Sequence, residues 1–343
     1  MQLIPSGIIQ VVVMEKNNVY PREIQVYSEF LVEVDKLLTS VGDTTKFAPT
    51  CLYTSNEPKQ LLVFEDMKEL GYTTYPRHRQ INYDEALPII VKLSKLHAAS
   101  VVLNERNPAI MDLYREGSIS VNPERQDFLV HYMNCARALG KVAENEWGPR
   151  WTEIAGKLKK FQYKIVQKGC DLYVRDENAF NVFNHNDLWT PNVLVKFDEH
   201  SSIEDVMFVD FQLNYFGSPS IDLNFFFYGS LSEETRLTFK TKLIKVYHQS
   251  LAESLVKFGY SKPVPTLHDI HVEILKTGMN SLIAAFAEVP LLICEQSDNL
   301  DMDTLLQDSD SAEAFRYTLF NNPKYKLFIQ PLLLEFDDYG YMD

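Results

Sequence analysis

The sequence predicts an α+β fold with two lobes, in which a small mixed lobe precedes a larger, mainly helical lobe. Three observations predict it. The chain has 343 residues, 45% of them hydrophobic and 23% charged, which is typical of a globular protein with a full core. Short apolar runs of strand length occur early in the chain. After them, apolar residues recur at three- and four-residue spacing over long stretches, and that spacing is typical of helices.

The predicted domains follow the change from strand-like to helical patterns. Residues 1–66 are predicted to form the small lobe, 67–76 the linker between lobes, and 77–343 the helical lobe. Within the small lobe, strands are predicted at 8–14 and 61–64, where short apolar runs end in polar or turn-forming residues.

Helices are predicted from periodic apolar positions together with start and stop signals. The first begins at Pro21, which suits the first turn of a helix, and ends near Gly42. Asp84 is predicted to cap the first helix of the larger lobe. Helices in that lobe are predicted at 84–99, 125–143, 152–167, 233–258, 268–287 and 328–336. The acidic run 294–314 is predicted to be a solvated loop rather than a metal site.

One polar segment of the larger lobe has the side chains that phosphoryl transfer from a nucleotide requires. His185, Asp187 and Asn192 stand on one short loop, and Asp210 follows the next apolar run. A carboxylate can meet a hydroxyl group, while an amide and a second carboxylate can supply the oxygen ligands that Mg²⁺ prefers. The sequence therefore predicts Asp187 as the catalytic carboxylate and Asn192 and Asp210 as metal ligands.

A predicted hairpin would bring the two metal ligands together. Apolar runs at 193–195 and 206–209 flank a polar turn, a pattern typical of two paired strands. Asn192 stands at the start of the first strand and Asp210 directly after the second. His185 is predicted to brace the loop through a hydrogen bond to the backbone near Asp210. Any one of these residues alone is better explained as a turn or cap residue, so the prediction rests on the whole set.

The same residues resemble the catalytic segment of the kinase-like phosphotransferases, which include aminoglycoside phosphotransferases and choline kinases. More specifically, they resemble the ecdysteroid kinase-like family, also called CHK kinase-like, whose motif is H-G-D-x-W-x-x-N followed by D-F-Q. Asn186 replaces the glycine of that motif, while Trp189, Phe211 and Gln212 match it.

Further segments carry the resemblance outside this loop. LVFEDM at 62–67 is similar to the family's hinge between lobes, and LHAAS at 96–100 to the end of its first large-lobe helix. Asp222 follows the metal-binding residue as in the family and is expected to anchor the catalytic loop by backbone hydrogen bonds. The resemblance implies a protein-kinase-like fold, ATP and Mg²⁺ as cofactors, and a small-molecule alcohol as the acceptor.

The resemblance also assigns residues to the nucleotide. In kinase-like folds a Glu at the position of Glu23 pairs with a strand lysine that holds the phosphates. This chain has Gln2 at the position where the family's pattern places that lysine. The chain also lacks a glycine-rich loop. We expect that the chain is N-terminally incomplete; the alternative is a natural short form with impaired catalysis. Glu65 and Met67 would lie at the adenine edge, although a strand end and a solvated turn explain them equally well.

The sequence leaves the acceptor open. The resemblance implies a hydroxyl group of an ecdysteroid, of another steroid or of a foreign compound. One alternative is a kinase of the choline or ethanolamine type. Another is a catalytically impaired binding protein that lacks the phosphate-clamping lysine. A protein kinase is disfavoured, because the chain lacks an A-P-E segment.

The net charge of the chain and the spacing of its cysteines limit the partners that it is expected to bind and the cell compartment in which it is expected to lie. The formal net charge of −14 disfavours nonspecific binding to nucleic acid and to anionic membranes. The four cysteines are far apart and show no CxxC or metal-binding spacing, which favours reduced thiols and a cytoplasmic location. The first residues lack the basic region and the small-residue cleavage site of a signal peptide. No protein partner is predicted.

Overall fold

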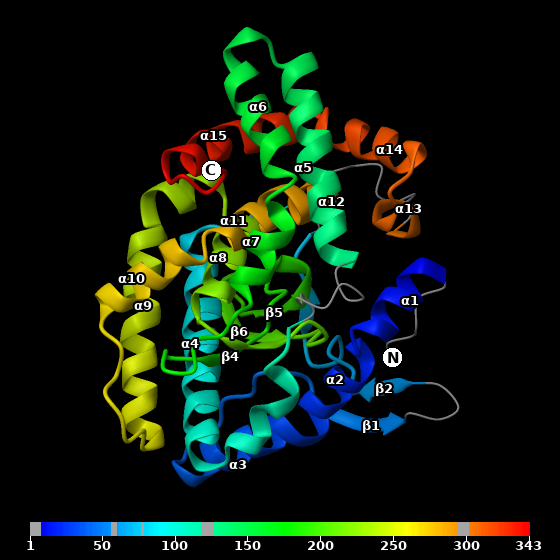
Figure 1. Cartoon of the computed structure of the whole chain (residues 1–343). Coiled ribbons are helices and arrows are strands. Elements are labelled where there is room, and N and C mark those ends of the chain that lie inside the picture. Colours follow the sequence, from blue (N-terminus) through cyan, green and yellow to red (C-terminus); the bar gives the residue numbers. More distant parts are fainter. Residues whose placement is uncertain (1–7, 56–59, 77–78, 118–126, 294–301) are drawn as a thin grey trace. The chain divides into compact units, whose positions relative to one another are not determined.

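The computed structural model describes residues 8–55, 60–76, 79–117, 127–293 and 302–343. As predicted, the fold is of the α+β class, with short strands in the N-terminal region and in the catalytic segment, and helices over most of the rest (Figure 1). The described residues divide into two compact units. Of these residues, unit 1 contains 18–55, 60–76, 79–117 and 175–276, and unit 2 contains 8–17, 127–174, 277–293 and 302–343. These units group residues by contact, and the boundaries of the two lobes stay a prediction.

The strands that the structure describes in unit 1 form three small antiparallel sheets. The pairs are β1 (Cys51–Ser55) with β2 (Leu61–Phe64), β3 (Tyr72–Thr74) with β5 (Val193–Phe197), β5 with β6 (Ile203–Phe208), and β4 (Val182–Asn184) with β7 (Tyr215–Gly217). The predicted strand at 61–64 is confirmed. The predicted catalytic hairpin is also confirmed, and β5 and β6 are its two strands.

Unit 1 also contains helices. They include α2 (Val19–Gln25), α3 (Leu31–Ser40), α4 (Tyr83–Arg106), α8 (Ser220–Gly229), α9 (Glu233–Phe258) and α10 (Leu267–Lys276). Among them, α4 packs against β4 and β6. The π-helical turn η1 (Val26–Phe30) joins α2 to α3, so the helix predicted from Pro21 to about Gly42 is confirmed with an earlier start. The bounds of α9 are those predicted from apolar spacing.

α4 packs along α9 in unit 1 (Figure 1). Asn82, and not the predicted Asp84, caps α4. The Asn82 side chain accepts a hydrogen bond from Glu85 N at 3.0 Å, and the Glu85 carboxylate accepts one from Asn82 N at 3.0 Å. This reciprocal pair satisfies two backbone donors at once. Asp84 instead lies in the first turn, where the helix dipole also favours a carboxylate, and the sequence signal of the two positions is therefore similar.

By length and composition α4 could cross a membrane, and among the described residues it is the one helix that meets this test. However, 78% of its 18-residue apolar window is buried inside the structure. Lys92 lies within this helix and is only 8% exposed, yet it is fully engaged with neighbouring acceptors. We therefore assign α4 as a core helix.

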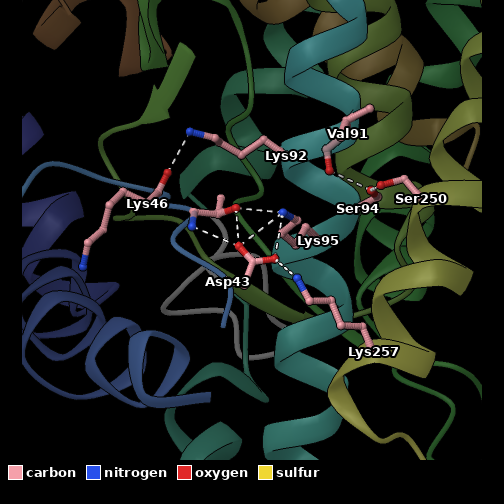
Figure 2. A network of polar contacts seen from close by, with 9 residues as sticks. Asp43, Lys46, Val91, Lys92, Ser94, Lys95, Ser250 and Lys257 are labelled. Atoms are coloured by element: carbon pink, nitrogen blue, oxygen red, sulfur yellow. Dashed lines mark hydrogen bonds and ion pairs between the residues drawn. The ribbon is translucent and has the colours of Figure 1, made fainter. Parts of the chain in front are cut away.

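A charged network fastens the loop after α3 to α4 and α9 (Figure 2). The Asp43 carboxylate accepts hydrogen bonds from Lys95 Nζ at 3.1 Å and Lys257 Nζ at 2.7 Å, and from Thr45 Oγ1 at 2.6 Å. Burial alone would raise the pKa of Asp43, but these hydrogen bonds hold it well below its usual range. Because Lys95 and Lys257 belong to different helices, Asp43 links both helices to the loop.

Lys92 joins the same loop to the catalytic hairpin. Its Nζ donates to the Lys46 carbonyl at 2.7 Å, as Figure 2 shows, and to Asp205 Oδ1 on β6 at 2.5 Å. The other Asp205 oxygen accepts from the Tyr72 hydroxyl on β3 at 2.6 Å. One lysine of the core helix thus fixes the strand that leads to the predicted metal ligand.

The described residues of unit 2 are mainly helical. Its helices are α1 (Ile8–Lys16), α5 (Asp127–Glu146), α6 (Thr152–Phe161), α7 (Ile165–Leu172), α11 (Met279–Ile283), α12 (Val289–Ile293), α13 (Met302–Leu306), α14 (Asp310–Phe320) and α15 (Pro323–Asp338). The helices predicted at 125–143 and 328–336 are confirmed with shifted ends. Those predicted at 152–167 and 268–287 are helical but interrupted.

The predicted strand at 8–14 is wrong, because this segment forms the helix α1. Its β-branched apolar run has the composition of a strand, but a strand needs a partner strand, and α1 packs against α13 instead. Val13 is 4% exposed in this position. Asn17 follows the helix, and its Nδ2 donates to the Val13 carbonyl at 2.8 Å.

The predicted loop at 294–314 is wrong in the part that the structure describes, while residues 294–301 lie outside the described residues. α13 begins at Met302, and Ser309 caps α14 by accepting from Ala312 N at 3.3 Å. Asp308 accepts a hydrogen bond from Arg137 Nη2 at 2.7 Å. Acidic side chains that meet cations and helix N-termini can be part of folded structure, so acidity alone did not identify a loop.

One acidic residue makes the stability of unit 2 depend on pH. Burial raises the pKa of Glu288, in the π-helical turn η6 (Ala284–Glu288), to about 7 from the ordinary value of 4.5. As pH rises between these two values, the unfolded chain releases the proton while the folded chain retains it. The folded state therefore loses stability over this range, and the full cost remains above about pH 7.

Replacing Glu288 by Gln is expected to raise the free energy of unfolding by about 1–3 kcal/mol at pH 8 and to change it little at pH 4. The amide resembles the protonated acid, so the gain should develop only where the native glutamate is ionised. Urea denaturation at the two pH values measures the difference. An equal gain at both would show that ionisation of Glu288 is not its cause.

Candidate active site

The loop that carries the predicted catalytic residues leaves a buried strand pair. β4 pairs with β7, and Asn184 at the end of β4 is 0% exposed. Asn184 Nδ2 donates to the carbonyls of Tyr215 at 3.3 Å and Gly217 at 3.2 Å. The side-chain amide of Asn184 therefore joins β4 to β7 in addition to the backbone hydrogen bonds of the strand pair. The loop that begins at His185 thus starts from a fixed strand end.

Asp222 on α8 anchors that loop, as the resemblance implied. Its two carboxylate oxygens accept hydrogen bonds from the backbone N–H groups of His185 at 2.8 Å and Asn186 at 2.7 Å. Asp222 is 0% exposed. Burying a carboxylate costs free energy unless hydrogen-bond donors compensate for its charge. These two hydrogen bonds therefore stabilise the buried charge of Asp222 and also hold the loop in place.

His97 is a further positioning residue that the sequence reasoning did not single out. Its Nε2 lies 3.1 Å from Asp222 Oδ2, and because a carboxylate only accepts, Nε2 carries the hydrogen. A hydrogen bond of 2.8 Å joins its Nδ1 to the Tyr247 hydroxyl on α9. Both rings are fully buried. The available signal was the LHAAS segment at 96–100, which matched the family without giving a role to its histidine.

The backbone explains why Asn186 can stand where the family's motif has glycine. Its φ of +62° lies in the left-handed region, which glycine and asparagine adopt more readily than other residues. Its Nδ2 also donates to the Leu213 carbonyl at 2.8 Å. Asparagine therefore keeps the turn and adds a side-chain hydrogen bond that glycine cannot make.

Replacing Asn186 by Ala is expected to lower the free energy of unfolding by about 1–2 kcal/mol, because alanine is strained at this φ and cannot bond to Leu213. Asn186→Gly should cost only about 0.5–1 kcal/mol, since it loses the bond but not the conformation. Thermal or urea denaturation of the two variants shows which of them loses more free energy of unfolding. If glycine were the more damaging replacement, the left-handed backbone would not be what selects this residue.

Asp187 and Asn192 are in direct contact. Asn192 Nδ2 donates to Asp187 Oδ2 at 2.8 Å and to the Asp187 backbone carbonyl at 2.9 Å. The loop between them contains the 3₁₀ turn η5 (Thr190–Asn192). Pro191 is the second residue of this turn. It excludes a longer α-helix but suits the start of this short turn, where its missing N–H is not needed.

The hairpin brings Asn192 next to the residue that precedes Asp210, as predicted. Val209 N donates to the Asn192 carbonyl at 3.0 Å, which continues the β5–β6 pairing. His185 Nε2 donates to the Val209 carbonyl at 2.8 Å, so the predicted brace near Asp210 is present. Burial lowers the pKa of His185, although the charge of Asp222 opposes this, which favours a neutral ring with its hydrogen on Nε2.

Asp210 fits a metal ligand by its surroundings. Its backbone has φ of +67°, an uncommon conformation for a residue with a side chain. Its Oδ1 is shielded from solvent and has no hydrogen-bond partner within the described chain. Burial raises the pKa of Asp210 to about 6. A divalent cation would compensate for the burial of this charge, and Mg²⁺ prefers such oxygen ligands.

The charge of Glu23 acts on the same two tyrosines as the charge of Asp210. Burial, followed by the charges of Glu23 and Asp210, raises the pKa of Tyr20 to about 12. The same two carboxylates also add to the effect of burial on Tyr27, whose pKa lies well above its usual value. Glu23 and Asp210 therefore lie near the same two phenols. A role for Glu23 in holding phosphates stays a prediction.

Aromatic rings connect these elements of unit 1. The Tyr27 ring centroid lies 4.7 Å from that of Phe64 on β2 and 5.8 Å from that of Phe211. The Phe211 ring lies 4.7 Å from the His185 ring. Phe211 is 0% exposed. The residue that follows Asp210 thus packs between the catalytic loop and the helical segment that carries Glu23.

A cavity of about 460 Å³ lies at the predicted adenine edge, and Glu65, Met67 and Leu194 are among its lining residues. Glu65 Oε1 already accepts from Thr50 N at 2.7 Å, and the Met67 carbonyl accepts from Tyr72 N at 2.8 Å. Recognition of a base in this cavity would therefore depend on other backbone groups and on apolar walls rather than on the Glu65 side chain.

A larger groove of about 680 Å³ lies on unit 2, but it contains none of the predicted site residues. Cations on its wall are already paired within the chain, such as Arg137 with Asp308 and Lys159 with Glu144. The candidate active site is therefore assigned to unit 1, where the catalytic loop, the hairpin and the smaller cavity belong to one compact unit.

Asp187 contacts Asn192 on the loop, and the hairpin pairs Asn192 with the residue that precedes Asp210. Such an arrangement is typical of the kinase-like phosphotransferases. Residues 8–260, more than half of the chain, match the ecdysteroid kinase-like family. The chain belongs to the ecdysteroid kinase-like family, and the resemblance seen in its motifs is confirmed.

The chain is also similar to a crystal structure of spectinomycin phosphotransferase in complex with ADP and spectinomycin. The similarity covers 86% of this chain and 84% of that chain, at 13% sequence identity and a TM-score of 0.40. A similarity of this degree carries no argument about function. No curated protein gives a match to this sequence.

Proposed function

We propose that this protein transfers the terminal phosphoryl group of ATP to a hydroxyl group of a small molecule. The observation that carries the proposal is the direct contact between Asp187 and Asn192, on a loop that the hairpin places beside Asp210. This arrangement offers one carboxylate for the acceptor hydroxyl and two oxygen-bearing side chains for a metal ion.

Asp187 acts on the acceptor. Its carboxylate takes the hydroxyl proton as the new oxygen–phosphorus bond forms and the bond between phosphorus and the ADP oxygen breaks. Asn192 Nδ2 holds this carboxylate in one orientation. His185 keeps the loop in place through its bond to the Val209 carbonyl and does not itself move a proton.

Asn192 and Asp210 are the residues that would hold Mg²⁺. The Asn192 amide donates through its nitrogen to Asp187, which leaves the amide oxygen to face a cation. Asp210 contributes Oδ1, which has no protein donor among the described residues. Bound Mg²⁺ would neutralise the negative charge on the phosphate oxygens.

The nucleotide would occupy the cavity near Met67 and Leu194. We propose that backbone groups at 65–67 contact the base and that Glu23 stands on the phosphate side. The segment 67–76 would then be the hinge between a nucleotide-binding lobe at 1–66 and the helical lobe at 77–343.

We propose an ecdysteroid, or another steroid or foreign alcohol, as the acceptor, in line with the family to which the chain belongs. We propose the cytoplasm as its location, because Cys51, Cys135 and Cys170 are free thiols. The net charge of −14 favours neither nucleic acid nor an anionic membrane as a partner.

The test is a transfer assay with the full chain, Mg²⁺-ATP, and four acceptors: ecdysone, a second steroid alcohol, an aromatic foreign alcohol and choline. Mass spectrometry detects a product heavier by one phosphate, and ADP release gives the rate. Transfer to a steroid or foreign alcohol supports the proposal. Transfer to choline alone would support the choline-type alternative, and nucleotide binding without any transfer would support a binding protein. Absence of both nucleotide binding and transfer would overturn the proposal.

A further inference from the structure

A groove on unit 2 has features of a ligand site that the proposed function does not use. It lies between α15 and the 3₁₀ turn η4 (Pro149–Trp151) and has a volume of about 350 Å³. Its lining residues are Arg150, Trp151, Leu327, Gln330, Pro331 and Leu334. The volume is in the range of small-molecule sites, which are mostly apolar with a few polar groups.

The apolar wall of the groove is formed by one face of α15. Leu327 is 73% exposed and Leu334 is 52% exposed, and Pro331 lies between them at helical spacing. Few neighbours restrain such exposed leucine side chains. They can therefore rearrange around a bound molecule at little cost, and covering them would remove apolar surface from water.

Two residues that line the groove have buried hydrogen-bond donors without acceptors. Trp151 is 3% exposed, and its Nε1 has no partner within the described chain. Gln330 Nε2 is likewise shielded from water and has no partner there. Arg150 places its guanidinium group over the Trp151 ring, 5.4 Å from the centroid. Buried N–H groups in native proteins nearly always have an acceptor, so two unpaired ones on residues that line the same groove call for an explanation.

We propose that this groove binds an amphiphilic anion, namely a molecule with an apolar body and a terminal carboxylate. A carboxylate only accepts hydrogen bonds, so it complements the N–H groups of Trp151 and Gln330 and the positive charge of Arg150. The apolar body covers Leu327, Pro331 and Leu334. The proposal does not depend on the function proposed for unit 1.

A competing explanation lies within the protein. The Trp147 and Trp151 rings meet edge to face, with centroids 5.3 Å apart. The indole N–H of Trp151 could thus point at the π face of Trp147, and such a contact is a weak hydrogen bond. In that case the donor is already engaged, and a carboxylate in solution would not change its environment.

Indole NMR distinguishes the two explanations. The chain has three tryptophans, so ¹⁵N labelling of the full chain gives three indole N–H resonances, which Trp→Phe variants assign. We expect titration with decanoate to shift the Trp151 indole proton downfield in a saturable manner. The Trp189 indole, which belongs to unit 1, should not move and serves as the internal control. No saturable shift at Trp151 would overturn the proposal.

Matched ligands and variants test the chemistry of the site. Decyltrimethylammonium and decanol share the chain of decanoate but lack the carboxylate, and both should bind at least about tenfold more weakly. Leu334→Asp should weaken decanoate binding by at least about tenfold through charge repulsion and loss of apolar contact. Leu275→Asp, on α10 and equally exposed at 53%, is the control and should have no effect.

The donors themselves are tested by Trp151→Phe and Gln330→Met. Each keeps the apolar bulk and removes the N–H group, so each should weaken decanoate more than it weakens decanol. If the two ligands lose affinity equally, the groove is a nonspecific apolar surface, and the proposed recognition of a carboxylate is wrong. The indole shift in the unaltered chain decides the question even if a variant fails to fold.

Discussion

Replacing Asp187 by Asn is expected to lower kcat for phosphoryl transfer by about 10³-fold and to leave the Kd of Mg²⁺-ATP within about twofold of the parent value. The amide cannot take the proton of the acceptor hydroxyl. It can still present an oxygen to Asn192 Nδ2, which now bonds to Asp187 Oδ2 at 2.8 Å. The loop geometry should therefore survive, so that the loss falls on chemistry and not on nucleotide binding.

Steady-state kinetics and calorimetric titration with Mg²⁺-ATP measure the two quantities. Asp198→Asn is the matched control. Asp198 is an exposed residue at the tip of the β5–β6 hairpin, and it makes only local turn contacts in the structure. It should leave both values unchanged. Equal turnover by the parent and by Asp187→Asn would remove Asp187 from the catalytic role.

Replacing Asp222 by Ala is expected to lower the free energy of unfolding by about 3–5 kcal/mol and to reduce activity further through loss of loop geometry. The change leaves the buried N–H groups of His185 and Asn186 without their acceptor. It also leaves His97 Nε2 unpaired in a fully buried site. Water cannot easily replace these contacts, because the surrounding side chains are closely packed.

Urea denaturation measures this effect, and Asp84→Ala is its control. Asp84 is also an acidic residue at a helix N-terminal turn, but it is exposed and is not the cap of α4. Its loss should cost no more than about 1 kcal/mol. A comparable cost for the two variants would mean that Asp222 acts through the helix dipole alone and not as the anchor of the catalytic loop.

Several predictions from sequence were correct because they rest on local patterns. The spacing of His185, Asp187, Asn192 and Asp210 identified the family, since the chemistry of that family fixes those residue types within one loop and hairpin. The helix at 233–258 was predicted with its observed bounds, because clear end signals mark it: Ser232 caps its start, and the left-handed Gly259 follows its end.

The incorrect predictions concern segments whose structure depends on distant partners. The run 8–14 has the composition of a strand, yet no strand in the described part of the chain pairs with it, and it packs as a helix on α13. The acidic run after 301 folds into α13 and α14, where Arg137 and Lys141 from α5 meet its carboxylates. Composition describes a segment alone and carries no information on such neighbours.

The sequence by itself determined the family and the β5–β6 hairpin, and it predicted a site from Asp187 and Asn192 on the loop 185–192 and Asp210 after the hairpin, because these are properties of residues that are close along the chain. Only the tertiary structure decided how the loop is held. His97 and Asp222 are 125 positions apart, and they meet only because the fold of unit 1 brings one residue of α4 and one of α8 within hydrogen-bond distance. Burial of a charge, a left-handed backbone and an unpaired donor in a groove all arise from packing, and packing is set by residues far apart in the chain.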